Sequence, residues 1–240
     1  MASGQSWMDA GRRAVQLLAL AALVALAGCV SSGGRKPIHS QARAPAHSTA
    51  KPVIKPMSDP QAFKMCTARL DAAQITYQPL PNQERGGGCA IIDSVKLLDF
   101  GTPTASLGAM TCDLAATFAA WTRYAVRPAA RLYLGSELVR IETFGTYACR
   151  DIRGAGGTIA GKLSEHAHAN AIDVSAFVLA DGRRISVIGD WTTDGPSSVF
   201  LHVIHDSACR RFRTVLSPDY NEAHHDHLHF DMGGKGGYCR

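Results

Sequence analysis

The chain has 240 residues, 46% of them hydrophobic, and is long enough for one globular domain with accessory segments. Its formal net charge of +5 is unevenly placed: residues 1–28 carry +1 and residues 29–55 carry +5, which leaves −1 for the remainder. The near-neutral remainder argues against a nucleic-acid-binding domain, so no nucleic-acid partner is expected.

The first predicted segment is a signal peptide over residues 1–28. Arg12 and Arg13 precede an apolar run that is too short and wrongly flanked for an ordinary transmembrane helix. "LAGC" (Leu26 to Cys29) is typical of a bacterial lipobox, although a plain signal peptide with a chance cysteine is an alternative. We therefore expect lipidation at Cys29 and attachment to the periplasmic face of a membrane. Val30 is not a retention aspartate, which favours the outer membrane.

Residues 29–56 form the second predicted segment. They are rich in Ser, Gly, Ala, Pro and Lys and contain few large apolar side chains. This composition is typical of a flexible basic tether, whose ends as a random coil would lie roughly 30 Å apart.

Residues 57–240 have the pattern of a folded domain. Asp59 as N-cap and Pro60 at the first helical position predict a helix over 59–73. Asp181-Gly182 predicts a hairpin between two strands within 171–188. The other predicted elements are a strand region over 86–100, a helix over 111–126 that ends before Pro128, a strand over 137–149, a helix from Pro196 to residue 212, and a strand over 227–232. This order indicates an α+β domain in which helices flank a small antiparallel sheet.

Six cysteines follow Cys29. An even number in an exported domain predicts three disulfides, and fifteen connectivities are possible. No two of them form a CxxC pair, which argues against a cysteine zinc knuckle. The six are Cys66, Cys89, Cys112, Cys149, Cys209 and Cys239.

The stretch "NEAHHDHLHFD", residues 221–231, has four histidines within six positions. On a strand, His227 and His229 point to the same face, because side chains alternate. Further donors are available in "SEHAHANAID", which contains His166 and Asp173. Two imidazoles, one carboxylate and an open position suit catalytic Zn²⁺, which makes a bound water nucleophilic near neutral pH.

These motifs carry a family resemblance. Ser164-x-His166-x-x-Ala169-x-Ala171-x-Asp173, followed by His227-x-His229, resembles the D-alanyl-D-alanine carboxypeptidase group of zinc peptidases, whose superfamily includes lysostaphin-type endopeptidases and the hedgehog domain. The chain is also similar to the bacterial extensin-like C-terminal family over most of residues 60–240. Further shared motifs are "YACR" (147–150), "PDYN" (218–221) and the closing "CR".

The resemblance implies a role for each matching residue. His166, Asp173 and His229 would be the zinc ligands. His227 would orient the water or stabilise the oxyanion, and His224 would be a further active-site histidine. Residues 57–240 would then form an extensin-like domain of the zinc peptidase type.

Two positions depart from the family pattern. Ala169 replaces the usual glycine, which is a mild change where φ is negative. Asp226 takes the place of a general-base glutamate. On a regular strand it would face away from His229, which favours His227 as the base-like residue.

Substrate contacts are expected from Tyr147 and Arg150, since a guanidinium binds a peptide carboxylate in a bidentate manner. A disulfide framework around Cys149 would explain the same stretch. His168 and His225 are expected to be bystanders, and His202 and His205 to lie on a helix surface. The alternative to the metal site is that the histidines form a solvated cluster. His166 would then lie in a capped turn, and Asp173 would be a charged residue of the hairpin.

The leading interpretation is a zinc-dependent peptidase that acts on peptidoglycan stem peptides or cross-links at the cell envelope. The first alternative is a non-catalytic zinc-containing module that binds the cell wall or serves as a structural lipoprotein. A structural lipoprotein without metal is the second alternative.

Overall fold

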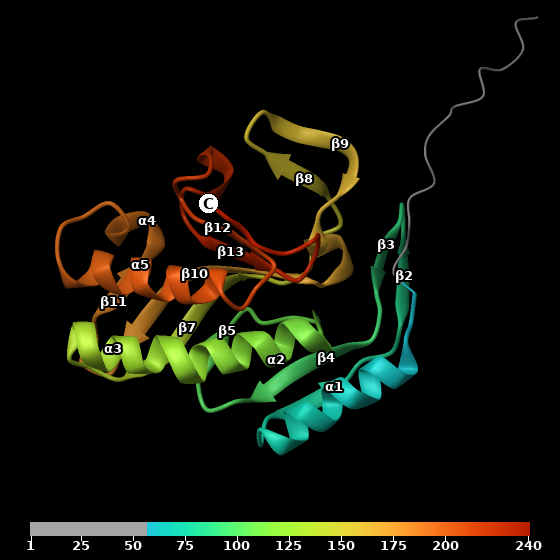
Figure 1. Ribbon diagram of the computed structural model, residues 1–240, viewed down its shortest axis with the longest axis horizontal. Coiled ribbons are helices and arrows are strands. Elements are labelled where there is room, and N and C mark those ends of the chain that lie inside the picture. Colours follow the sequence, from blue (N-terminus) through green and yellow to red (C-terminus); the bar gives the residue numbers. More distant parts are fainter. Residues whose placement is uncertain (1–56) are drawn as a thin grey trace, which may run out of the picture. The chain divides into compact units, whose positions relative to one another are not determined.

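The computed structural model describes residues 57–240, and the predicted signal peptide, tether and lipidated Cys29 lie outside them. The domain contains both helices and mostly antiparallel strands, as the α+β prediction expects (Figure 1). The first part of the chain contains α1 (Pro60–Ala72), β1 (Thr76–Pro79), β2 (Gln83–Gly86), β3 (Cys89–Ile91), β4 (Ser94–Asp99), β5 (Thr104–Ala105) and β6 (Met110–Thr111). Asp59 caps α1 as predicted, because its side chain accepts a hydrogen bond from the Ala62 backbone N–H at 3.0 Å.

A long helical run follows, and here the sequence prediction was wrong. The run consists of α2 (Cys112–Trp121), a π-helical turn (Thr122–Val126) and α3 (Arg127–Leu134), so it passes through Pro128. Within the π turn the Arg127 N–H bonds the carbonyl of Thr122, five residues back. The π turn restarts the α-helical ladder at Arg127, which places Pro128 in the first turn of α3, where a proline needs no N–H.

The remaining elements build the sheet that carries the site. They are β7 (Leu138–Gly145), β8 (Asp151–Gly154), β9 (Gly157–Leu163), a 3-10 helix (Glu165–His168), β10 (Ala171–Leu179), β11 (Arg184–Ser186), α4 (Val187–Asp190), α5 (Pro196–Cys209), β12 (Thr214–Leu216), a 3-10 helix (Glu222–His224), β13 (Leu228–Asp231) and β14 (Tyr238–Cys239). The hairpin at Asp181-Gly182 joins β10 to β11 as predicted.

The largest sheet has seven strands in the order β14-β12-β13-β10-β7-β5, with β11 paired to β10. Its central pairs are antiparallel, whereas the edge pairs β12–β14 and β5–β7 are parallel. A three-stranded sheet (β1-β4-β6) and the hairpins β2–β3 and β8–β9 complete the strands. No helix within residues 57–240 has both the length and the apolar character needed to cross a bilayer.

The core lies between the large sheet and the helices. Trp121 of α2 is fully buried, with its ring centroid 5.0 Å from that of Phe230 on β13 and 6.3 Å from that of Phe177 on β10. Its indole N–H donates to the carbonyl of Ile204 on α5 at 3.0 Å. This packing fixes which face of β13 points away from the helices, and the histidines occupy that face.

Residues 57–240 contain three disulfides, which confirms the prediction from the cysteine count and settles the connectivity. Cys66–Cys112 links α1 to α2, Cys89–Cys149 links β3 to the segment after β7, and Cys209–Cys239 links α5 to β14.

Candidate metal centre

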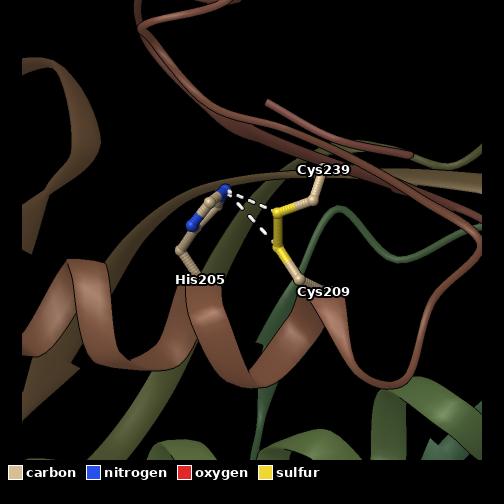
Figure 2. Close-up of side chains that lie close together, drawn as sticks. All are labelled: His205, Cys209 and Cys239. Carbon is tan, nitrogen blue, oxygen red and sulfur yellow. Dashed lines mark hydrogen bonds between the residues drawn. A yellow bond between two sulfur atoms is a disulfide. The ribbon is translucent and has the colours of Figure 1, made fainter. Parts of the chain in front are cut away.

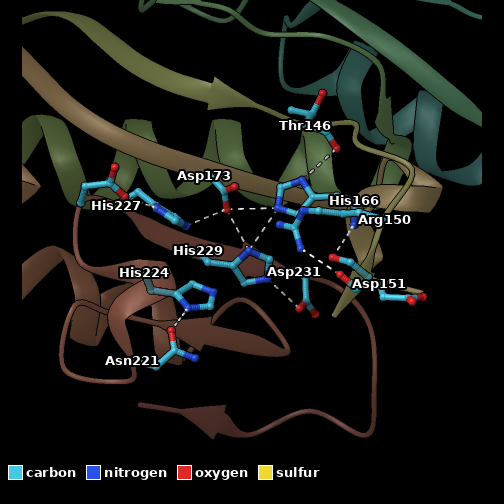
Figure 3. A network of polar contacts seen from close by, with 12 residues as sticks. Thr146, Arg150, Asp151, His166, Asp173, Asn221, His224, His227, His229 and Asp231 are labelled. Atoms are coloured by element: carbon cyan, nitrogen blue, oxygen red, sulfur yellow. Dashed lines mark hydrogen bonds and ion pairs between the residues drawn. The ribbon is translucent and has the colours of Figure 1, made fainter. Parts of the chain in front are cut away.

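The three predicted ligands come together from two adjacent strands and one short helix. Asp173 on β10 and His229 on β13 are direct cross-strand partners. His166 lies in the 3-10 helix that precedes β10, and the Ser164 side chain accepts the His166 backbone N–H at 3.3 Å at the start of that helix. Figure 3 shows the three side chains pointing toward one another.

The three donor atoms form a small triangle. His166 Nε2 is 3.1 Å from Asp173 Oδ1, Asp173 Oδ1 is 2.9 Å from His229 Nδ1, and the two ring nitrogens are 3.2 Å apart. Tetrahedral ligands at the usual Zn–N and Zn–O distances of about 2.0–2.1 Å lie about 3.3 Å from each other. The spacing therefore fits a small divalent cation.

The outer nitrogen of each ring supports the same conclusion. His166 Nδ1 is 3.3 Å from the carbonyl oxygen of Thr146, and His229 Nε2 is 3.0 Å from Asp231 Oδ2. Because both partners are acceptors, each ring donates its N–H outward and can direct a lone pair toward the triangle. Ligating histidines in metal sites are held in this way.

Burial and charge act strongly on this cluster. Burial alone would raise the pKa of Asp173, but hydrogen bonds from His166 and His229 hold it well below its usual range. Burial alone would lower the pKa of His229, but its hydrogen bonds to Asp173 and Asp231 raise it to about 9. Asp173 is thus anionic at neutral pH, as a carboxylate ligand must be, and His229 gives up its Nδ1 proton when a cation binds.

His227 stands beside the triangle. Its Nε2 is 3.4 Å from Asp173 Oδ1, and its Nδ1 donates to Asp226 Oδ1 at 2.8 Å. Since β13 begins at Leu228, Asp226 lies before the strand and reaches His227, not His229. An imidazole oriented by a carboxylate is suited to accepting a proton at Nε2.

His224 is also part of the cluster. Its Nδ1 donates to Asn221 Oδ1 at 2.6 Å, and its ring centroid is 5.2 Å from that of His227. Burial lowers its pKa to about 3, and the nearby His229 and His227 add to this effect. His224 is therefore a neutral imidazole near physiological pH.

A cleft of about 710 Å³ opens onto these residues. It is bordered by His166, Asp173, His224 and His227 on one side and by the β8–β9 hairpin on the other. Phe144, Tyr147, Arg150 and Arg153 also line it. An open cleft beside a set of converging donors is the usual form of a ligand site.

Arg150 is the half-buried cation of this cleft. Burial lowers its pKa, Asp173 opposes that effect, and Arg153 adds to it. One of its guanidinium nitrogens donates to the backbone carbonyl of Asp151 at 3.3 Å. Most of its donors remain available to a ligand in the cleft.

The predicted bystanders lie outside the triangle. His168 borders a different cavity of about 520 Å³, His225 is exposed at the border of the cleft, and His202 is exposed on α5. The prediction that His205 lies on a helix surface was wrong, because its side chain faces inward and the residue is only 8% exposed. It lies against the Cys209–Cys239 disulfide.

The backbone at Ala169 also corrects the sequence analysis. The replacement of glycine was expected to be mild at negative φ, but φ is +52° and ψ is +30°, in the left-handed region. The Ala169 carbonyl accepts from the Thr111 N–H at 2.8 Å, and the neighbouring Asn170 carbonyl accepts from the Met232 N–H at 3.2 Å. These contacts hold a conformation that alanine disfavours.

Sequence reasoning missed three residues of the cluster: Asp231, Thr146 and Asn221. Alternation was a usable signal for Asp231, which is two residues beyond His229 on the same strand face. Thr146 acts through its backbone carbonyl and left no side-chain signal. Asn221 lies in two of the motifs named above, but neither motif indicated a role for it.

Residues 64–240 match the family model described as "Extensin-like protein C-terminus". No match was found among curated proteins or among solved structures.

Proposed function

The chain belongs to the extensin-like C-terminal family, and from its converging donor atoms we propose that it is a zinc-dependent peptidase acting on peptidoglycan stem peptides or cross-links. The observation that carries the proposal is the triangle of His166 Nε2, Asp173 Oδ1 and His229 Nδ1, in which both rings donate their outer N–H to fixed acceptors. Zn²⁺ bound there would supply a Lewis acid that polarises the scissile carbonyl and acidifies a water.

The residues around the triangle supply proton transfer, oxyanion stabilisation and substrate positioning. His227 Nε2 accepts the proton of the attacking water or donates to the developing oxyanion, and Asp226 stabilises the charged imidazole. His224 is held by Asn221 and borders the same cleft, where a neutral ring offers a hydrogen-bonding atom without added positive charge. The β8–β9 hairpin forms the far wall of the cleft and limits how the peptide lies.

Arg150 is proposed to bind the carboxylate of the stem peptide. A bidentate pair with a carboxylate would use the guanidinium donors that face the cleft and would compensate their partial burial. Tyr147 lines the same wall, where the Arg85 guanidinium lies 5.9 Å from its ring centroid and helps to hold it.

The location of the protein is part of the proposal. The lipobox-like "LAGC" supports lipidation at Cys29 and attachment to the periplasmic side of a membrane, with the outer membrane favoured. A basic segment of about thirty residues would then let the domain reach peptidoglycan.

The decisive experiment is turnover of purified muropeptides by zinc-loaded full-length protein, followed by mass spectrometry. Wild type is expected to release peptide products. His227→Ala should retain zinc but lower kcat by about 10²–10⁴-fold, because it removes the proton-transfer group and no ligand. His229→Ala and Asp173→Ala should lose zinc. A substrate whose terminal carboxyl is amidated tests Arg150, since its KM should rise in wild type but not in Arg150→Gln.

The same experiment separates the alternatives. Tight wall binding with zinc, but no products from either wild type or His227→Ala, would indicate a non-catalytic wall-binding module. Protein purified without zinc and unable to take it up would indicate a structural lipoprotein.

A further inference from the structure

A second cluster of metal-binding side chains lies on the other side of β13 and β12, at α5. His205 and Cys209 are one helical turn apart on α5, and Cys239 lies on β14. His205 Nε2 is 3.8 Å from Cys209 Sγ and 3.9 Å from Cys239 Sγ (Figure 2). Figure 2 shows the ring directed at the disulfide that joins the two cysteines.

The imidazole of His205 is held in the form that a ligand requires. Its Nδ1 is 3.4 Å from Asp206 Oδ1, and its ring centroid is 5.5 Å from that of Trp191 in an edge contact. Burial lowers the pKa of His205, and the opposing effects of Asp206 and of the Arg240 backbone do not overcome it. A neutral ring that keeps its proton on Nδ1, beside the Asp206 carboxylate, directs the lone pair of Nε2 toward both sulfurs.

The disulfide is within reach of a reductant. Cys209 and Cys239 are both partly exposed and Cys149 of the second disulfide is exposed, whereas Cys66 and Cys112 of the first disulfide are each 3% exposed. A phosphine breaks the S–S bond, takes the oxygen of a water molecule to become its oxide, and leaves a thiol on each cysteine. A dithiol does the same by exchange and becomes a cyclic disulfide.

We propose that reduction of Cys209–Cys239 creates a second zinc site, with Cys209 Sγ, Cys239 Sγ and His205 Nε2 as ligands. Each thiol gives up its proton as the cation binds, and soft sulfur ligands with an imidazole suit Zn²⁺. In the oxidised protein the sulfurs are bonded to each other and do not bind the ion. The cluster thus holds β14 against α5 covalently when oxidised and through a cation when reduced.

The link between β14 and α5 affects the seven-stranded sheet. Thr214 and Val215 of β12 pair with Tyr238 and Cys239 of β14, and β12 pairs in turn with β13. Leu216 of β12 is the partner of His229. A cation at the reduced cysteines would preserve the edge of the sheet that carries the first metal centre.

The test uses full-length protein and Co²⁺, which replaces Zn²⁺ and absorbs strongly in the near ultraviolet only when thiolates bind it. Reduced wild type should develop this thiolate-to-cobalt band, saturating at one ion per chain, and oxidised protein should not. The His166, Asp173 and His229 centre contains no sulfur, so it cannot produce the band.

Variants identify the ligands. Cys209→Ser should abolish the band, and His205→Ala should weaken Co²⁺ binding at the thiolates by at least about tenfold, as loss of a ligand does. His202→Ala is the matched control, because His202 is on the same helix and packs on Trp191 without facing the sulfurs. If His205→Ala does not fold by near-ultraviolet circular dichroism, His205→Gln replaces it. The absence of a band in reduced wild type, or equal affinity in wild type and the His205 variant, would overturn the proposal and leave the peptidase proposal unaffected.

Discussion

In the proposed metal centre, the outer nitrogen of His229 matters as much as the nitrogen that faces the other donors. Asp231 Oδ2 accepts this N–H at 3.0 Å and is itself 6% exposed. The carboxylate fixes the ring orientation and makes Nδ1 a better donor to a cation. Asp231 therefore belongs to the site, although it does not face the triangle.

Replacing this carboxylate should weaken metal binding without removing a ligand. Asp231→Asn is expected to lower zinc affinity by about 10–100-fold, measured by competition with a chromogenic chelator. Asp226→Asn is the matched control, because Asp226 bonds His227 and no ligand, and its zinc affinity should equal that of wild type. Equal losses in both variants would show that Asp231 has no special relation to the metal.

Ala169 provides a second test at this scale. Because its φ is +52°, Ala169→Gly relieves left-handed strain but gives up a buried methyl group and adds unfolded-state entropy, so stability should change by less than about 1 kcal/mol. Ala169→Val should lose more than about 2 kcal/mol, because a β-branched side chain fits neither this φ nor a fully buried position. Urea unfolding measures both. A neutral valine variant would contradict the left-handed conformation.

The convergence of His166, Asp173 and His229 was predictable from sequence, and the groups that hold their rings were not. His166, Asp173, His227 and His229 stand in motifs whose spacing can be recognised. The carbonyl of Thr146 reaches His166 because of the path of the backbone after β7, and no residue type encodes that. Asp226 was expected to face away from His229 on a regular strand. It does not contact His229, but the reason differs: β13 begins only at Leu228, and Asp226 lies before it and bonds His227.

Strand β10 shows at the scale of an element why alternation is an incomplete guide. Its register with β7 shifts between Asp173 and Val174 and again between Val174 and Ala176. On a regular strand, even-numbered and odd-numbered residues would face opposite sides of the sheet. These irregularities let Ile172, Val174, Phe177 and Leu179 all join the core. Asp173 points instead to the cleft. Bulges beside a functional residue re-aim side chains in this way, and sequence alone does not place them.

The long helical run illustrates a different limit. Pro128 was correctly recognised as a residue that disfavours an α-helix interior, yet the helix continues. The π turn over Thr122–Val126 inserts one extra residue and puts the proline where its missing N–H does no harm. Apolar residues at a period of 3.6 indicate a regular α-helix and do not reveal such an insertion.

A charged cross-link on β7 gives a pH-dependent test. Glu142 pairs with Arg140 at 2.9 Å and, across β10, with Arg184 of β11 at 2.8 Å. The hydrogen bond from Arg140 lowers the pKa of Glu142, and Arg184 adds to this against the opposing effect of burial. Because the folded-state pKa is depressed, the stabilisation is complete above the ordinary glutamate pKa of 4.5 and is lost as pH falls through the lowered value.

Glu142→Gln should therefore destabilise the protein by at most about 1 kcal/mol at pH 7, since the group is partly exposed. The difference from wild type should shrink as pH falls below 4.5 and vanish once Glu142 is protonated in the folded state. Chemical unfolding at several pH values measures it. A difference that is constant with pH would mean that the charge of Glu142 contributes nothing.

For the whole molecule, the fold class and the number of disulfides followed from sequence, and the strand order did not. The cysteine count allowed fifteen pairings, and only the packing of α1 on α2 and of β14 beside α5 selects one. The parallel edge strands β5 and β14 are two residues each, too short for any periodicity to reveal. Long-range pairing depends on the assembled core, which is encoded by many residues together.

The Cys66–Cys112 disulfide tests how strongly such long-range links stabilise the domain. It joins α1 to α2 across 46 residues, and both cysteines are almost fully buried. The chain-entropy model for a loop of this length predicts that Cys66→Ser with Cys112→Ser lowers the free energy of unfolding by about 4 kcal/mol. The slope of that free energy against urea should also rise, because an unfolded chain without the link exposes more surface. A lower midpoint with an unchanged slope would mean that the serines harm the native core instead, since the link would then not restrict the unfolded chain.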